Sequence, residues 1–175
     1  MLERLKRSFE NAPVIPKGDY NYVVHPITDG APMIDPILLE EVLEAMEEEL
    51  PEFDIIVTAE AMGIPLATGL SLRHGKPFTI IRKRKYGLPG EVEVHQKTGY
   101  SKGRLYINGL KKGDRILLVD DMLSTGGTLW AILAAFRSMG VKVMEVVIVV
   151  EKGNGSVRRG LERQFGVEIR ALMNI

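Results

Sequence analysis

The chain has 175 residues, a length typical of one folded domain that can bury a full hydrophobic core. Lys plus Arg and Asp plus Glu both total 23, so the net charge is zero and no bulk electrostatic attraction to nucleic acid is expected. The chain has no cysteine, no close histidine spacing, no recognisable leader and no apolar run of ~20 residues, which predicts a cytoplasmic protein without disulfides, zinc or membrane contacts.

The first third of the chain is expected to hold two helices joined by a long connection. Residues 2–9 carry apolar side chains at helical spacing and predict a short amphipathic helix. Residues 12–36 are rich in Pro, Gly, Asp and Tyr, and only short extended pieces are expected there. Asp35 can cap a second helix that Pro36 opens and that runs over 36–50. Loops as long as 12–36 usually carry function.

Strands and helices alternate from residue 54 onward. The expected strands are 54–59, 78–81, 92–94, 104–107, 116–119, 143–150 and 167–172, and the expected helices are 64–72, 129–139 and 157–165. The two short strands before residue 108 should form a weak ribbon. This alternation predicts an α/β protein with a central, mostly parallel sheet flanked by helices.

The most informative stretch runs from Ile116 to Thr128. Its four leading apolar residues predict a central parallel strand, and ligands bind beyond the carboxyl ends of such strands. A turn of hydroxyls and glycines before a helix can hold a phosphate on its N–H groups. This turn consists of Ser124, Thr125, Gly126, Gly127 and Thr128. Asp120 and Asp121 would repel a phosphate, so they are expected to face a sugar diol or a cation.

Two further segments are suited to anions. Residues 58–65 join a buried strand to a helix, with Gly63 at the turn, and predict a second anion-binding turn beside the first. The cations of 82–85 follow the strand 78–81, and their mutual repulsion is tolerable only in solvent or against a polyanion. Two anion sites suit a phosphate and a pyrophosphate. No Gly-x-x-x-x-Gly-Lys or Gly-x-Gly-x-x-Gly motif supports a kinase or a dinucleotide-binding protein.

The run 116–128 closely resembles the binding signature of type I phosphoribosyltransferases, enzymes that use phosphoribosyl pyrophosphate. Residues 82–103 most resemble the archaeal hypoxanthine/guanine phosphoribosyltransferases, which have an adenine-phosphoribosyltransferase-like architecture. The resemblance extends from the first residues to about Lys152. It implies one phosphoribosyltransferase domain over 1–175, with a small hood at about 12–36 and a flexible lid at about 83–103.

The resemblance also implies roles for individual residues. Asp120 and Asp121 would bind the ribose hydroxyls as the catalytic acids, and residues 124–128 would bind the 5-phosphate. The pyrophosphate residues would be Glu60, Ala61, Met62, Gly63, Arg82, Lys83 and Lys85. Adenine-specific relatives often place an arginine where Met62 stands, so one cation is missing here. Mg²⁺ is the expected cofactor, held mainly by the substrate and without a direct protein ligand.

The purine site is less defined by the sequence. Ile27 and Thr28 lie in the hood segment, where Ile27 or Tyr22 is a candidate stacking face for the base. Lys152 follows the strand 143–150 and could donate to the carbonyl of a 6-oxopurine, or it could simply be solvated.

The group that handles the purine proton stays open. The resemblance would place an acid at Gly99 in the lid or at Ser124, and this chain has neither. Water, a main-chain carbonyl, Glu93 and Asp29 are the alternatives.

The expected function is purine salvage, in which hypoxanthine or guanine reacts with phosphoribosyl pyrophosphate to give IMP or GMP and pyrophosphate. An adenine phosphoribosyltransferase is the first alternative. A regulator that senses phosphoribosyl pyrophosphate without turning it over is the second, although the chain has no room for a DNA-binding module. Family members are usually homodimers, so a homodimer is expected.

Overall fold

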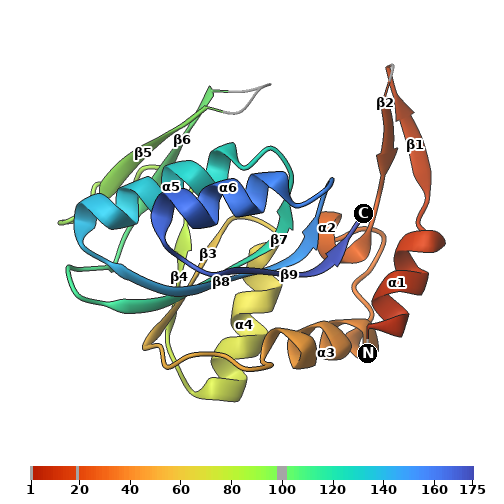
Figure 1. Cartoon of the computed structure of the whole chain (residues 1–175), viewed down its shortest axis with the longest axis horizontal. Coiled ribbons are helices and arrows are strands. Elements are labelled where there is room, and N and C mark those ends of the chain that lie inside the picture. The colour runs from red at the N-terminus through yellow and green to blue at the C-terminus, as the bar shows by residue number, and fades with distance from the viewer. Residues whose placement is uncertain (1, 19, 98–101) are drawn as a thin grey trace.

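The computed structural model describes residues 2–18, 20–97 and 102–175 and has a five-stranded sheet at its centre (Figure 1). The strand order is β4-β3-β7-β8-β9, and all four neighbouring pairs are parallel. The strands are β3 (Ile55–Ala59), β4 (Phe78–Ile81), β7 (Arg115–Leu123), β8 (Lys142–Glu151) and β9 (Ile169–Asn174). The predicted α/β architecture with a parallel central sheet is therefore confirmed.

Helices cover both faces of the sheet. The helices are α1 (Glu3–Glu10), α2 (Pro26–Asp29), α3 (Pro36–Met46), α4 (Gly63–His74), α5 (Gly127–Met139) and α6 (Ser156–Phe165). Figure 1 shows α5 and α6 on one face and α3 and α4 on the other, with α1 next to α3. Leu117 and Val119 of β7 pack toward α3 and α4, whereas Leu118 packs toward α5. Because both faces are buried, the central strands have continuous apolar runs.

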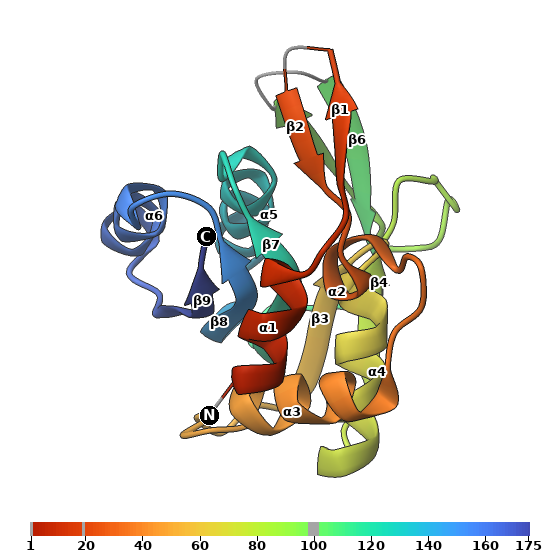
Figure 2. The same ribbon diagram turned by 90° about the vertical axis from the view of Figure 1, so that its right-hand side faces the viewer.

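Two antiparallel hairpins flank the sheet. One pairs β1 (Val14–Lys17) with β2 (Tyr20–Val23), and the other pairs β5 (Val92–Lys97) with β6 (Lys102–Ile107). They project from the same side of the molecule, with the turn between β7 and α5 lying between them in Figure 1, and Figure 2 shows the same direction from the side. The weak ribbon expected near residues 92–107 is confirmed and is longer than predicted.

Apart from shifts of one or two residues at other ends, three differences from the prediction stand out. The connection 12–36 contains a regular hairpin and the short helix α2, because Val14 to Lys17 pair with Tyr20 to Val23. The helix expected over 36–50 ends at Met46, and the chain turns with Glu49 at φ 53°. The strand expected to end at Val119 continues to Leu123, because β8 pairs with it along that whole length.

Within the described residues, no helix has the length and apolar character needed to cross a membrane.

His25 joins α1 to α2. Its ring is fully buried, caps α2 and stacks on Phe9 with ring centroids 3.6 Å apart. Nδ1 accepts a hydrogen bond from the N–H of Ile27 at 3.2 Å, so Nε2 carries the proton and donates to Ser8 Oγ at 2.8 Å. Ser8 Oγ in turn donates to the carbonyl of Leu5 at 2.7 Å. The network requires a neutral imidazole, and burial lowers the pKa of His25 from 6.5 to about 4 despite the nearby charge of Asp29.

The lowered pKa of His25 predicts a pH-dependent stability. The folded state binds the proton more weakly than the unfolded state, so the stabilisation is complete above pH 6.5 and is lost as the pH falls toward 4. The loss is expected to reach about 3 kcal/mol. The His25→Asn variant keeps a capping oxygen but does not titrate. We expect the difference in unfolding free energy between wild type and His25→Asn, measured by urea denaturation, to shrink from pH 7 to pH 4.5. Parallel pH dependences would contradict this prediction.

Candidate active site

Asp120 and Asp121 lie inside β7, near its carboxyl end. Both side chains are half-buried, and Asp120 Oδ1 accepts a hydrogen bond from the N–H of Asp121 at 3.1 Å. The sequence placed them after the strand, but β7 extends through them, and Asp120 is in register with Ile148 of β8. Their backbone is therefore held by the sheet, which fixes the two carboxylates more firmly than a loop would.

Burial disfavours the charged form of both acids. It is the main reason why the pKa of Asp121 rises from 3.8 to about 6. Burial, followed by the charge of Asp121, raises the pKa of Asp120 well above its usual value. The ligand-free pair therefore retains a proton readily, and a ligand that brings positive charge or donates hydroxyl hydrogens would favour full ionisation.

The turn after β7 forms a small polar cavity. Its volume is about 120 Å³, and its lining residues are Asp120, Met122, Leu123, Ser124, Thr125, Gly126, Gly127, Thr128, Leu129 and Ile148. Gly126 has no side chain with which to cap α5, so first-turn N–H groups remain for an anion. Gly126 also has φ 77°, and a Cβ there would lie 2.5 Å from Val157 Cγ1 of α6. The structure thus brings all five residues of the predicted phosphate turn together with Asp120.

The second predicted turn lies next to this cavity, because β3 and β7 are neighbours in the sheet. Gly63 begins α4, and a Cβ at this position would lie 1.8 Å from Thr58 Oγ1 and 3.1 Å from Asp120 Oδ1. Ala61 is exposed and Met62 is partly exposed, and the peptide bond between Glu60 and Ala61 is cis. The close approach of Gly63 places this turn directly beside the acid pair.

Two of the predicted pyrophosphate residues are paired with each other. Glu60 Oε2 lies 2.9 Å from Arg82 Nε, and Glu60 Oε1 accepts a hydrogen bond from the N–H of Lys83. The backbone of Arg82 also exchanges hydrogen bonds of 2.7 and 3.0 Å with Tyr106 of β6. These contacts anchor the start of the basic segment beside the second turn. Lys83 and Lys85 are exposed. Residues 98–101, which include Gly99 of the predicted lid, lie outside the described residues.

The hood segment contacts β7, which carries Asp120 and Asp121, and also the turn between β3 and α4. Its helix α2 lies beside β7, and a Cβ at Gly30 would be 3.3 Å from Sδ and Cε of Met62. Ile27 is only 2% exposed and packs in the core, so its side chain is not available as the stacking face that we expected. Thr28 Oγ1 donates to Asp29 Oδ2 at 2.8 Å. The sequence did not indicate that Ile27 would pack in the core and thereby hold α2 in place.

Lys152 lies just after β8, beside the phosphate turn. Its N–H donates to the carbonyl of Leu123 at 2.8 Å, and the adjacent Gly153 N–H donates to the carbonyl of Ile175 at 3.0 Å. The backbone position expected for Lys152 is therefore confirmed, at the same edge of the sheet as the acid pair. Its contact with a base stays a prediction.

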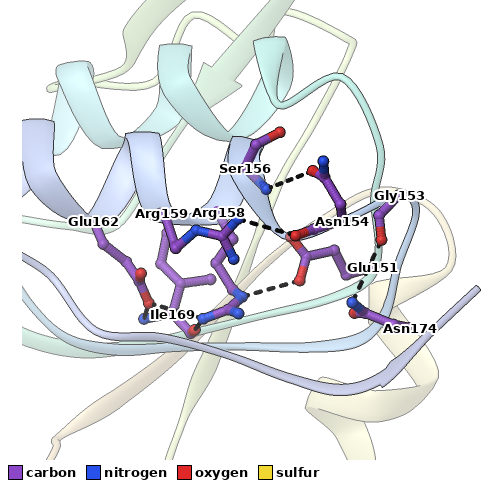
Figure 3. A network of polar contacts seen from close by, with 9 residues as sticks. All are labelled: Glu151, Gly153, Asn154, Ser156, Arg158, Arg159, Glu162, Ile169 and Asn174. Carbon is purple, nitrogen blue, oxygen red and sulfur yellow. Dashed lines mark hydrogen bonds and ion pairs between the residues drawn. The ribbon is translucent and has the colours of Figure 1, made fainter.

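A polar network fixes the turn after β8 (Figure 3). Glu151 is 1% exposed, and its Oε2 accepts a hydrogen bond from Arg158 Nε at 2.9 Å. Arg158 also reaches Glu162 at 3.3 Å, and Asn154 Oδ1 accepts from the N–H of Ser156 at the start of α6. Sequence reasoning missed this network. The signal was an acid that ends the apolar run of β8, since a buried carboxylate requires a partner.

The two acids considered for the purine proton lie in different places. Glu93 is on the β5–β6 hairpin, 3.4 Å from Arg104 and 3.5 Å from His95. Asp29 is in the hood, close enough to Asp121 for its charge to contribute to the raised pKa of that acid. Of these two acids, Asp29 is therefore the one whose charge acts on the acid pair.

The fold and site define an α/β protein with two glycine-containing turns and an acid pair at the carboxyl edge of a parallel sheet. The chain belongs to the phosphoribosyltransferase family, because the family model described as "Phosphoribosyl transferase domain" matches residues 36–163. This confirms the resemblance seen in the sequence.

Full-length relatives are more specific. The chain is 54% identical over 176 residues to a protein of Methanosarcina mazei named hypoxanthine/guanine phosphoribosyltransferase, with 100% of this chain and 92% of the relative covered. A protein of the same name from Methanothermobacter thermautotrophicus is 53% identical, with 100% and 90% covered.

Solved structures show the same fold. Adenine phosphoribosyltransferase from Thermoanaerobacter pseudethanolicus matches with a TM-score of 0.79 and 25% identity over 100% of both chains. The Saccharomyces cerevisiae adenine phosphoribosyltransferase, complexed with an imino-altritol bisphosphate and adenine, matches with a TM-score of 0.76 and 22% identity over 97% of both chains. The latter likeness concerns the fold alone.

Proposed function

We propose that the chain is a cytoplasmic enzyme of purine salvage that joins hypoxanthine or guanine to phosphoribosyl pyrophosphate, giving IMP or GMP and pyrophosphate. The observation that carries this proposal is the placement of two anion-binding turns on adjacent strands with an acid pair between them. The names of the relatives at 53–54% identity over the full chain support the choice of purine.

The acid pair would hold the sugar. The ribose hydroxyls would donate hydrogen bonds to Asp120 and Asp121, while the 5-phosphate would accept hydrogen bonds from the N–H and hydroxyl groups of residues 124–128. When the bond between C1 and pyrophosphate breaks, positive charge develops on the ribose. Two ionised carboxylates held by β7 would stabilise that charge without reorganising. The purine nitrogen then attacks the opposite face of C1, forming the new C–N bond as the C1–pyrophosphate bond is lost, and its proton passes to water or to a main-chain carbonyl.

The second turn and the basic segment would receive the leaving group. The N–H groups near Gly63 and the cations Arg82, Lys83 and Lys85 would bind the pyrophosphate. Because Arg82 is paired with Glu60, Lys83 and Lys85 are the cations that can approach the pyrophosphate without breaking that ion pair.

Mg²⁺ is proposed to arrive with the substrate. Among the described residues, no group of three or more His, Asp or Glu side chains could hold a metal ion. A metal ion that the substrate brings in would lie next to Asp120 and Asp121, whose carboxylates would favour its positive charge. Bound in that way, the ion would neutralise the leaving group as a Lewis acid.

The base would bind between the hood segment and the turn after β8. A 6-oxopurine has a carbonyl acceptor where adenine has an amino donor, so a donor from Lys152 or the backbone beside it would favour hypoxanthine and guanine. Adenine is the alternative, and the name of the solved structure at 25% identity is what favours it.

The proposal also includes a homodimer. Large apolar side chains are exposed on the first hairpin, on the segment that leads into α3 and in the first turn of α3. They are Val14, Ile15, Met33 and Ile37, with exposed fractions of 56%, 40%, 78% and 56%. Exposed apolar groups of this kind are typical of surfaces that meet a partner. Light scattering on the purified protein would give the molar mass directly.

Turnover tests the proposed function. Purified protein is incubated with phosphoribosyl pyrophosphate and Mg²⁺ and, separately, with hypoxanthine, guanine, xanthine and adenine, and nucleotide formation is measured by chromatography. We expect product from hypoxanthine and guanine. Product from adenine only would reverse the assignment of the base. Binding of phosphoribosyl pyrophosphate without product from any base would favour a sensor.

A further inference from the structure

Three donors converge on the carboxylate of Asp29, at the end of α2. The hydroxyl of Tyr22 donates to Oδ1, while the N–H of His25 donates to Oδ2 at 2.9 Å and the hydroxyl of Thr28 donates to Oδ2 at 2.8 Å. The four residues belong to β2, to α2 and to the link between them. Asp29 therefore ties the first hairpin to α2 through side-chain and main-chain groups at once.

The position of α2 connects this cluster with the site. The helix lies beside β7, the strand that carries the acid pair, as Figures 1 and 2 show from two directions. The next residue, Gly30, approaches the side chain of Met62 in the second anion-binding turn. A displacement of Asp29 would therefore change the contacts of α2 with β7 and those of Gly30 with Met62, and not only those within the hood segment.

We propose that Asp29 is a positioning residue of the reaction, which holds Tyr22 and α2 in place at the purine site and sets the electrostatic field beside Asp121. This inference rests on the proposed function. It assigns to Asp29 a role that acts through Tyr22 and Asp121, and it makes Tyr22 a determinant of purine binding.

The ionisation of Asp29 agrees with positioning rather than proton transfer. Burial by itself would raise the pKa of Asp29, but the hydrogen bonds from Tyr22, His25 and Thr28 lower it below the ordinary value. A carboxylate that is fully ionised and already accepts three hydrogen bonds is a weak proton acceptor.

Asp29 stands in a defined set of charges. It faces His25, whose buried ring is neutral at pH 7, and Asp121, whose own charged neighbour on β7 is Asp120. The negative charge of Asp29 adds to the burial that raises the pKa of Asp121. Removal of that charge should therefore lower the pH at which the acid pair ionises, provided that the pair itself is unchanged.

Tyr22→Phe and Asp29→Asn separate the two parts of the proposal. Tyr22→Phe removes one hydroxyl and leaves the charge of Asp29, so the purine KM is expected to rise on the order of tenfold while the KM for phosphoribosyl pyrophosphate stays within about twofold. Asp29→Asn is expected to raise the purine KM similarly. It should also move the acid limb of kcat/KM for phosphoribosyl pyrophosphate to lower pH, which Tyr22→Phe should not do.

Asp35→Asn is the matched control. Asp35 lies in the same segment, and its carboxylate caps α3 by accepting from the N–H of Ile37 at 2.7 Å. Asparagine is an equally good cap, so this variant should behave as wild type in both KM values and in the pH profile. Circular dichroism of all three variants confirms that each is folded at the assay temperature.

Each outcome decides one question. A wild type that forms no nucleotide overturns the proposed function and this inference together. An active wild type with Tyr22→Phe and Asp29→Asn indistinguishable from Asp35→Asn overturns this inference alone. An equal rise of both KM values, with an unshifted acid limb in Asp29→Asn, would show a merely structural role. A selective rise in purine KM in both variants, with the acid limb shifted only in Asp29→Asn, supports positioning.

Discussion

Replacement of Asp120 and Asp121 by Asn is expected to reduce kcat by on the order of 10²–10³ or more, measured as IMP or GMP formation at saturating substrates. Asp120 is the one acid among the residues that line the cavity after β7, and Asp121 follows it directly on the same strand. Asparagine preserves their size and can still accept hydrogen bonds from ribose hydroxyls, but it cannot stabilise developing positive charge. A double variant with near wild-type kcat would contradict the assigned catalytic role.

The pH dependence of the unfolding free energy provides a control for the double variant Asp120→Asn/Asp121→Asn. Burial raises the pKa of Asp121 to about 6, so the folded protein favours the protonated acid and its charged form is destabilising above that pH. As the pH falls from about 6 to 3.8, wild type should gain stability relative to the double variant, which lacks this titration. At pH 7.5 the double variant should be at least as stable as wild type in urea denaturation. Loss of activity together with undiminished stability would locate the effect in the chemistry.

The Gly63→Ala variant is expected to lose kcat/KM for phosphoribosyl pyrophosphate by about 10²-fold, because small misplacements at a reacting site have effects of that size. A Cβ at this position would lie 1.8 Å from Thr58 Oγ1 and 3.1 Å from Asp120 Oδ1. We therefore expect the start of α4 to move away from β3 and from the acid pair, because the buried, β-branched Thr58 has little room to turn aside. Overpacking of this kind also costs about 1–3 kcal/mol of stability, measurable by urea denaturation.

Two control variants test the steric explanation. Thr58→Ala removes the hydroxyl with which the new Cβ would collide, so Thr58→Ala/Gly63→Ala should recover part of the lost kcat/KM. Gly160→Ala adds the same methyl group inside α6, where a Cβ would meet nothing within 4 Å. It should stabilise the helix by about 0.5–1 kcal/mol and leave the kinetics unchanged. No recovery in the double variant would contradict the steric explanation.

Local sequence patterns were sufficient for the sheet and for the phosphate turn. The apolar runs that became β3, β7 and β8 are buried on both faces. A strand buried in this way consists of consecutive apolar residues, which are visible in the sequence. The turn at 124–128 consists of five consecutive residues, so its geometry is local and was predictable together with the acids that precede it. The end of β7 was misplaced, because acids disfavour a strand locally and only the pairing with β8 extends it.

Contacts between distant segments could not be read from the sequence. Ile27 seemed suited to face a base, yet the packing of α2 against the core buries it. Arg82 and Glu60 were both assigned to pyrophosphate, and only the adjacency of β3 and β4 shows that they pair with each other. Contacts such as these, between residues far apart in the sequence, cannot be deduced from the positions of the residues along the chain.

The sequence by itself determined the parallel α/β sheet and the family of this protein, and it predicted the acid pair and the phosphate turn. Each follows from a short run of residues whose burial or hydrogen-bonding capacity is set by their own chemistry. Tertiary structure alone decided the surroundings of that site. The convergence of Tyr22, His25 and Thr28 on Asp29, the contact of Gly30 with Met62 and the raised pKa of Asp121 depend on which segments fold against one another. Burial and distance are properties of the packed chain, and they set the charge and the geometry of the acid pair and of the turns around it.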